Sequence, residues 1–209
     1  MRKNVSLLQI FVQINVAISY KLVQKNVDMK RNVLSKLIDW KNKKNRKPLI
    51  LNGARQVGKT YILREFGSQC YEKMAYVNCD KNKMLEKIFS QDYNISRILL
   101  SLSAILHVNI EPGNTLIIFD EIQESPTVLN SLKYFCEDAP QYHVAVAGSL
   151  LGISLHNNTS FPVGKVDMIK MYPMTFDEFL MAIGEQPLVD ILATKDFSII
   201  DSLSVRFID

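Results

Sequence analysis

Residues 49–60 read Leu-Ile-Leu-Asn-Gly-Ala-Arg-Gln-Val-Gly-Lys-Thr, and residues 53–60 fit the pattern G-x-x-x-x-G-K-[ST] without a mismatch. An apolar run precedes this pattern and a helical spacing of apolar residues follows it, as a phosphate-binding loop between a strand and a helix requires. Glycine at both ends permits backbone conformations that a Cβ would hinder, so the loop amides can face a phosphate. A glycine-containing turn that matches by chance is the alternative, and the flanking strand and helix argue against it.

The loop pattern assigns a task to each part of the stretch. We expect Lys59 to reach the β- and γ-phosphates of a nucleotide and the Thr60 hydroxyl to ligate Mg²⁺. The helix that begins near Lys59 adds the positive end of its dipole. The predicted nucleotide-binding residues are Gly53, Ala54, Arg55, Gln56, Val57, Gly58, Lys59 and Thr60.

A second stretch, residues 115–123, reads Thr-Leu-Ile-Ile-Phe-Asp-Glu-Ile-Gln, in which four apolar residues precede two acids. In an open α/β sheet, ligands bind at the carboxyl ends of the strands, so these acids should lie beside the phosphate loop. We expect Asp120 to hold Mg²⁺, directly or through water, and Glu121 to orient and deprotonate an attacking water. A strand end capped by solvated acids is the alternative, which the upstream phosphate loop disfavours.

A third candidate is Ser149, which follows the strand expected at Tyr142–Ala147. A small polar residue at this position could contact the γ-phosphate or polarise the attacking water. A plain strand-to-loop turn explains Ser149 equally well, so both interpretations stay open.

The rest of the pattern alternates strands with helices, which predicts an α/β fold with helices on both faces of a five-stranded parallel sheet. Gly67 is expected to end the helix after the phosphate loop, and Thr175 to cap a later one. The expected strands are Pro48–Asn52, Met74–Asp80, the apolar run from Thr115, Tyr142–Ala147 and Val166–Tyr172. The expected helices are Val33–Trp40, Lys59–Phe66, Lys83–Ser90, Asn94–Leu106, Ser125–Ala139 and Phe176–Ile183.

Bulk composition restricts the functional classes. With 209 residues, 47% hydrophobic, the chain can form one domain with a full core. The net charge of +4 is too small to indicate nucleic acid without a localised patch. Residues 41–47 hold five cations, but no aromatic residue is interleaved to stack on bases, so a solvated connector is favoured. Three cysteines without a C-x-x-C and three histidines without metal spacing argue against zinc and fit a reducing cytoplasm.

The two ends of the chain differ from its centre. Residues 5–20 are apolar but interrupted by Gln9, Gln13 and Asn15, short of the ~20 residues of a membrane helix. We interpret residues 1–28 as an extension or a peripheral helix; a poor signal peptide, or translation from Met29, is the alternative. Residues 29–185 are the predicted nucleotide-binding domain. Residues 186–209 show no stop signal and are expected to begin a truncated C-terminal region.

Five stretches together resemble the ATPase domain of a prokaryotic AAA+-type P-loop ATPase family, over roughly residues 30–190. In order they are GARQVGKT (53–60), LIIFDEIQE (116–124), AGSLLG (147–152), SFPVGKV (160–166) and YPMTFDEFL (172–180). The resemblance implies a Walker A loop at residues 53–60, a Walker B pair at Asp120 and Glu121, and a sensor-1 position at Ser149. It also implies the strand order 5-1-4-3-2 in a three-layer P-loop fold.

The resemblance further implies a C-terminal domain, which is missing or only begun here. No arginine is identified as a finger for the transition state, an element worth ~10³–10⁵ in rate. Arg55, Arg64 and Arg97 are explained as a loop residue and solvated helix faces, and the role of Lys165 is open.

The leading hypothesis is a cytoplasmic, Mg²⁺-dependent ATPase whose turnover drives a conformational change in a C-terminal module or a protein partner. An ATP-binding switch with little intrinsic hydrolysis is the main alternative. A GTPase is disfavoured because no [NT]-K-x-D signature exists, and a small-molecule kinase because paired acids at a strand end favour water as the acceptor. The sequence supports neither nucleic acid nor a membrane as partner and leaves the oligomeric state open.

Overall fold

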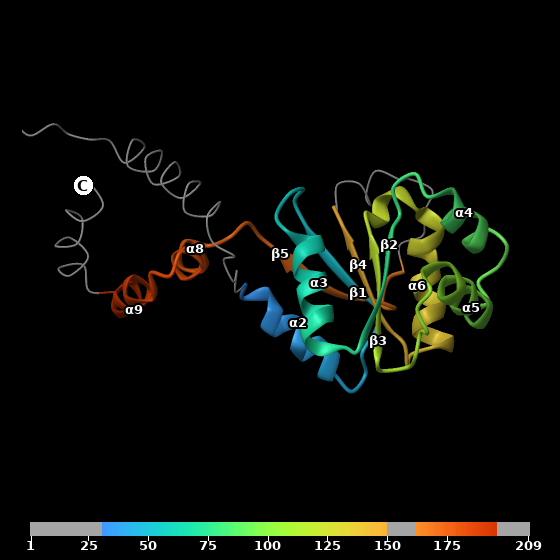
Figure 1. The fold of residues 1–209 in the computed structure, drawn as a ribbon, viewed down its shortest axis with the longest axis horizontal. Helices are drawn as coiled ribbons and strands as arrows, with labels where there is room; N and C mark the ends of the chain where they lie inside the picture. The colour runs from blue at the N-terminus through green and yellow to red at the C-terminus, as the bar shows by residue number, and fades with distance from the viewer. Residues whose placement is uncertain (1–30, 150–161, 196–209) are drawn as a thin grey trace, which may run out of the picture. The chain divides into compact units, whose positions relative to one another are not determined.

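The computed structural model describes residues 31–149 and 162–195, which form two compact units (Figure 1). One unit comprises Asn32–Pro173, and the other contains Arg31 and the described residues from Met174 onward. The proposed extension at residues 1–28, parts of two family motifs and residues 196–209 lie outside the described residues. The predicted domain limits at 28/29 and 185/186 stay predictions.

The larger unit is built on one parallel sheet with the strand order β2-β3-β4-β1-β5, which confirms the predicted order read from its other edge. The strands are β1 Leu49–Gly53, β2 Lys73–Asn78, β3 Thr115–Asp120, β4 His143–Gly148 and β5 Asp167–Met171. The register pairs Asn78 with Asp120 and Asn52 with Gly148. The loops after β1, β2, β3 and β4 consequently leave the sheet at the same edge.

Helices cover both faces of this sheet and complete the three predicted layers (Figure 1). Alternate residues of β3 point to opposite sides, with Leu116 and Ile118 in one core cluster and Ile117 and Phe119 in the other. Because both faces are buried, the central strands are continuously apolar. On one face lie α2 Val33–Asn42 and α3 Lys59–Cys70; on the other lie α4 Lys83–Phe89, α5 Ile95–Leu106 and α6 Pro126–Asp138.

The prediction that Gly67 ends the helix after the phosphate loop is wrong, because α3 continues to Cys70. Gly67 is buried, and a Cβ at this position would lie 2.1 Å from Met74 Sδ on β2. Glycine is thus accommodated within α3 where the helix packs closely on the sheet, at the cost of some helix propensity.

The described part of the second unit contains two helices, α8 Phe176–Ala182 and α9 Gln186–Thr194. The Thr175 hydroxyl accepts from the Glu178 amide and the Glu178 carboxylate accepts from the Thr175 amide, so the predicted cap is confirmed as a capping box. Glu178 also pairs with Arg31 at 3.1 Å, with both side chains nearly buried. Helix α9 was not predicted, although Leu188, Ile191 and Leu192 have the i, i+3, i+4 spacing of one helix face.

The basic connector at residues 41–47 is exposed at residues 42–45, and several of its cations contact other segments of the chain. Lys43 pairs with Asp167 at 2.6 Å, and Lys47 Nζ donates to the Gly164 carbonyl at 2.6 Å. Arg46 donates to the Pro140 carbonyl at 3.2 Å and lies over the Trp40 ring. Lys43, Arg46 and Lys47 thus have structural roles in the segment that leads into β1.

His143, at the start of β4, is buried among aromatic rings. Its Nδ1 lies 2.7 Å from Tyr71 Oη, and the Tyr71 and Trp40 rings meet it edge to face. Burial, followed by the positive charges of Arg46 and Lys41, lowers the pKa of His143 to about 4. The folded protein therefore keeps this ring neutral where the unfolded chain would protonate it.

The low pKa of His143 predicts a pH-dependent stability. Between the unfolded pKa of 6.5 and about 4, the unfolded chain binds the proton that the folded state refuses, so stability falls as the pH falls. From about pH 7.5 to about pH 5 we expect a loss of about 1–2 kcal/mol from this residue. Urea unfolding at both pH values should show a smaller loss in His143→Gln, which cannot titrate. Equal losses in the two proteins would contradict the assignment.

Candidate functional site

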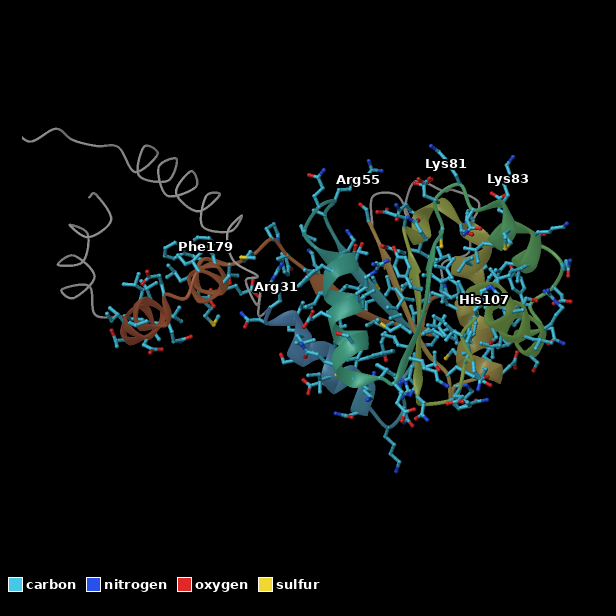
Figure 2. The ribbon with its side chains drawn as sticks, in the orientation of Figure 1. Arg31, Arg55, Lys81, Lys83, His107 and Phe179 are labelled. Atoms are coloured by element: carbon cyan, nitrogen blue, oxygen red, sulfur yellow. The ribbon has the colours of Figure 1, made fainter. Side chains whose placement is uncertain are left out.

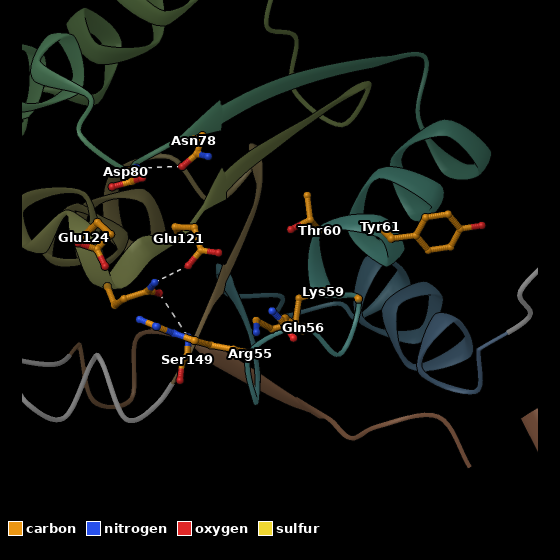
Figure 3. A pocket seen from close by; sticks show the side chains of 12 residues that line it. Arg55, Gln56, Lys59, Thr60, Tyr61, Asn78, Asp80, Glu121, Glu124 and Ser149 are labelled. Carbon is orange, nitrogen blue, oxygen red and sulfur yellow. Dashed lines mark hydrogen bonds between the residues drawn. The ribbon is translucent and has the colours of Figure 1, made fainter. Parts of the chain in front are cut away.

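A cleft of about 720 Å³ opens where the loops after four strands meet (Figure 3). This volume is within the range of nucleotide- and cofactor-sized sites. Its lining comes from Arg55, Gln56, Gly58, Lys59, Thr60 and Tyr61 after β1; Asn78 and Asp80 at the end of β2; Glu121, Gln123 and Glu124 after β3; and Ser149 after β4. Figure 2 shows Arg55 at the same edge of this unit as Lys81 and Lys83.

In the loop after β1, the unusual backbone conformation predicted for both glycines is found at Gly58 but not at Gly53. Gly58, immediately before α3, has φ 92°, which favours glycine, and Gln56 also has a positive φ of 63°. Gly53 has no positive φ; a Cβ there would lie 2.4 Å from the Met171 carbonyl oxygen of β5. Glycine is therefore needed at position 53 because it has no Cβ, and not because the backbone there is unusual.

Lys59, the first residue of α3, folds back over this loop. Its ammonium donates to the Gly53 carbonyl at 3.0 Å and to the Ala54 carbonyl at 2.7 Å. Burial lowers the pKa of Lys59, and the carboxylates of Glu121 and Asp120 oppose that shift. Lys59 lines the cleft, and its ammonium is held there by the carbonyls of its own loop. Gly53, Ala54 and Val57 do not themselves line the cleft.

The two predicted metal ligands are in direct contact. Thr60 Oγ1 donates to Asp120 Oδ2 at 2.7 Å, although the residues come from different segments of the chain. The Asp120 carboxylate is nearly buried, and its other oxygen accepts from the Glu121 amide at 3.0 Å. A hydroxyl and a carboxylate oxygen side by side are suitable ligands for a hard divalent cation.

A metal site made by protein ligands alone is not found within residues 31–149 and 162–195, where no three His, Cys, Asp or Glu side chains converge on one point. Mg²⁺ in phosphate-binding loops needs only one or two protein oxygens, because the phosphates supply others. Thr60 and Asp120 therefore fit Mg²⁺ bound together with a nucleotide.

Glu121 and Ser149 both line the cleft, and a third residue joins them. Glu121 is exposed and adopts the left-handed conformation (φ 52°, ψ 45°), which is uncommon for a residue with a side chain. The Gln123 side chain donates to the Glu121 carboxylate and accepts from the Ser149 amide at 3.3 Å; Figure 3 draws both bonds as dashed lines. The structure thus brings the predicted catalytic residues Lys59, Glu121 and Ser149 to one cleft.

Two polar residues at this edge were missed by the sequence analysis, Tyr76 and Gln123. The Tyr76 hydroxyl donates to Asp120 Oδ2 at 2.9 Å, beside the bond from Thr60. Burial and then Asp120 raise the pKa of Tyr76, so the phenol stays a donor. The position of Tyr76 in the sequence could have indicated this role. It lies two residues before the end of β2, and strand alternation places it on the face of the sheet that α3 covers.

The arginines outside the loop have contacts that their expected exposure did not suggest. The exposed Arg64 of α3 places its guanidinium 4.0 Å from the Tyr76 ring centroid. Arg97 pairs with Asp92 at 2.9 Å and donates to the Ile88 carbonyl, which fixes the start of α5.

The parallel sheet, the phosphate loop and the paired acids define a P-loop nucleotide-binding fold. A family model described as an AAA domain matches residues 45–180, and the chain belongs to this family of AAA ATPases. Nucleotide binding and hydrolysis are the general activities of that family.

Solved structures similar to this chain include the following two. The Aeropyrum pernix ORC1 protein in complex with DNA is 15% identical with a TM-score of 0.47, over 79% of this chain and 54% of that one. C. elegans PCH-2 is 11% identical with a TM-score of 0.36, over 79% and 42%. This chain thus spans about half the length of the first and less of the second. A comparison with curated proteins gave no match.

Among residues 31–149 and 162–195, no helix combines the length and the apolar character needed to cross a bilayer.

Proposed function

We propose that the cleft binds ATP together with Mg²⁺ and hydrolyses it to ADP and phosphate. The observation that carries this proposal is the convergence of Lys59, the Thr60–Asp120 pair and Glu121 from two distant segments on one cleft. The alternative is an ATP-binding switch with little hydrolysis of its own, and it makes the same binding predictions.

Each residue has a role that follows from its chemistry. The loop amides and Lys59 would bind the phosphates, and Thr60 and Asp120 would hold Mg²⁺. When bound, Mg²⁺ neutralises charge that develops on the phosphate oxygens. Glu121 orients a water and accepts its proton as the water oxygen bonds to the γ-phosphorus and the bond to the leaving ADP oxygen breaks. We assign Ser149 to the γ-phosphate end of the cleft.

The acidic pair Asp120 and Glu121 at the end of β3 favours water over a second substrate as the phosphoryl acceptor, which supports hydrolysis over a kinase reaction. The absence of a guanine signature in the sequence favours ATP over GTP. We further propose that residues 29–185 form the ATPase domain in the cytoplasm. Turnover would drive a conformational change passed to the region beginning at 186, or to a protein partner.

Nucleic acid is not included in this proposal. ORC1 of Aeropyrum pernix was solved with DNA. In this chain the candidate patch at residues 41–47 has Lys43 paired with Asp167, and Arg46 and Lys47 donate to backbone carbonyls. These contacts occupy donors that a phosphate backbone would need.

Calorimetric titration of the wild-type chain with ATP or GTP, each with Mg²⁺ or with a chelator, tests the proposal when combined with phosphate release. We expect saturable binding of ATP that weakens without Mg²⁺, weaker binding of GTP, and release of phosphate. Binding without any release of phosphate would favour the switch. An absence of binding would reject the proposed site.

Replacing the Tyr76 hydroxyl should weaken the hold on Mg²⁺. Tyr76→Phe removes one of the two donors to Asp120 Oδ2, a loss of about 1 kcal/mol, or about fivefold in Mg²⁺ affinity. A Mg²⁺ titration of the ATP-loaded protein measures this change. Tyr134→Phe is the matched control, because Tyr134 stacks on Tyr93 and does not line the cleft. Equal Mg²⁺ affinities in the two variants would contradict a role for Tyr76.

A further inference from the structure

Gln123 is a polar side chain that is almost completely buried, with 4% of its surface exposed. It lies in the short 3₁₀ turn Ile122–Glu124 that follows β3. Its amide nitrogen donates to Glu121 Oε2, and its amide oxygen accepts from the Ser149 backbone N–H at 3.3 Å. One side chain therefore links the ends of the neighbouring strands β3 and β4.

The chemistry of these two partners is specific for a side-chain amide. Glu121 offers a carboxylate, which needs a donor, and Ser149 offers an N–H, which needs an acceptor. Glutamine supplies both from one group. A glutamate at 123 would place a second carboxylate against Glu121, and a methionine of similar size would satisfy neither partner.

The backbone around Glu121 makes this side-chain contact important for orientation. Glu121 occupies the left-handed region, and its amide is bonded to Asp120 Oδ1 at 3.0 Å. The backbone is thus fixed, whereas the carboxylate is exposed to solvent and can rotate unless something holds it. Within residues 31–149 and 162–195, the Gln123 amide is the side-chain donor seen on that carboxylate.

On the basis of the proposed hydrolysis, we infer that Gln123 is a positioning residue. It fixes the carboxylate of Glu121 and makes its direction depend on the segment at Ser149. Gln123 does not touch the reacting atoms and acts through Glu121. We have assigned Ser149 to the γ-phosphate end of the cleft. A shift of the backbone at Ser149 would therefore move the Gln123 side chain and, through it, the carboxylate of Glu121.

Steady-state phosphate release provides the first test. Gln123→Met should lower kcat tenfold to a hundredfold, because misplacement of a reacting group by about 1 Å has that effect, while KM stays within about twofold. Gln69→Met is the matched control; the Gln69 amide also donates to a glutamate, Glu65, but on an exposed face of α3. The double variant Glu121→Gln/Gln123→Met should be no slower than Glu121→Gln alone, because Gln123 acts through Glu121. Additive losses, or an unchanged kcat in Gln123→Met, would overturn the inference.

Nuclear magnetic resonance provides a second test that does not need hydrolysis. In ¹⁵N-labelled protein, the side-chain amide pair that disappears in Gln123→Met belongs to Gln123. We expect Glu121→Ala to shift that pair and the Ser149 backbone amide, and Glu86→Ala, on the exposed surface of α4, to shift neither. An unshifted Gln123 pair in Glu121→Ala overturns the inference whatever the activity. Lack of phosphate release by wild type, with that shift present, rejects only the proposed hydrolysis.

Discussion

Glu121→Gln is expected to bind ATP as the wild type does and to release phosphate at least a hundredfold more slowly. Glutamine has the same size and can still accept the bond from Gln123, so the cleft should keep its shape. It cannot take a proton from water, and a positioned general base contributes about 10²–10⁴ in rate. Phosphate release at saturating ATP, with ATP affinity measured in parallel, separates these two effects.

The matched control for this variant is Glu86→Gln, which makes the same change of charge on the exposed surface of α4 and outside the cleft. It should release phosphate at the wild-type rate. A normal rate in Glu121→Gln would assign the proton transfer to another group and leave Glu121 with no catalytic role. Loss of ATP binding in Glu121→Gln would instead indicate that the carboxylate supports the fold of the cleft.

Lys59→Ala is expected to weaken ATP binding about tenfold to a hundredfold. The ammonium would lose charge-assisted bonds to the phosphates, each worth about 1.5–3 kcal/mol. The variant also loses the bonds from Lys59 to the Gly53 and Ala54 carbonyls, which order the loop. Calorimetric titration with ATP and Mg²⁺ measures the affinity, and circular dichroism checks that the fold is kept.

Lys36→Ala serves as the control for this second variant, because Lys36 is exposed on α2 and outside the cleft. It removes the same charge and should bind ATP as the wild type does. Equal affinities of Lys59→Ala and wild type would show that the loop after β1 does not bind phosphate.

The sequence was most informative where local pattern decides the structure. The apolar runs Pro48–Asn52 and Tyr142–Ala147 and the run from Thr115 predicted strands, and the family resemblance implied their order. The parallel sheet confirms the strands and the order. Since carboxyl ends of parallel strands share an edge, residues chosen from separate motifs could be expected to meet, and Lys59 and Glu121 do line one cleft.

The sequence was least informative where contacts between distant segments decide. A Cβ at position 53 would collide with the Met171 carbonyl of β5, and a Cβ at position 67 would collide with the Met74 side chain of β2. Local propensity predicts neither, since each depends on which strand lies alongside. The same holds for Tyr76 and Gln123, whose polar ends matter only because Asp120 and Ser149 lie within reach.

The most direct test of hydrolysis by this chain is single-turnover conversion of labelled ATP to ADP in acid-quenched samples, with Mg²⁺ present and with protein in excess over ATP and above the Kd for ATP. Under these conditions nearly every ATP molecule is bound and the quench frees any product still on the protein, so the rate reports the chemical step and not the release of product. We predict complete conversion by the wild type and retention of intact, bound ATP by Glu121→Gln. Bound ATP that stays intact in the wild type, or conversion at equal rates in both proteins, would contradict the account.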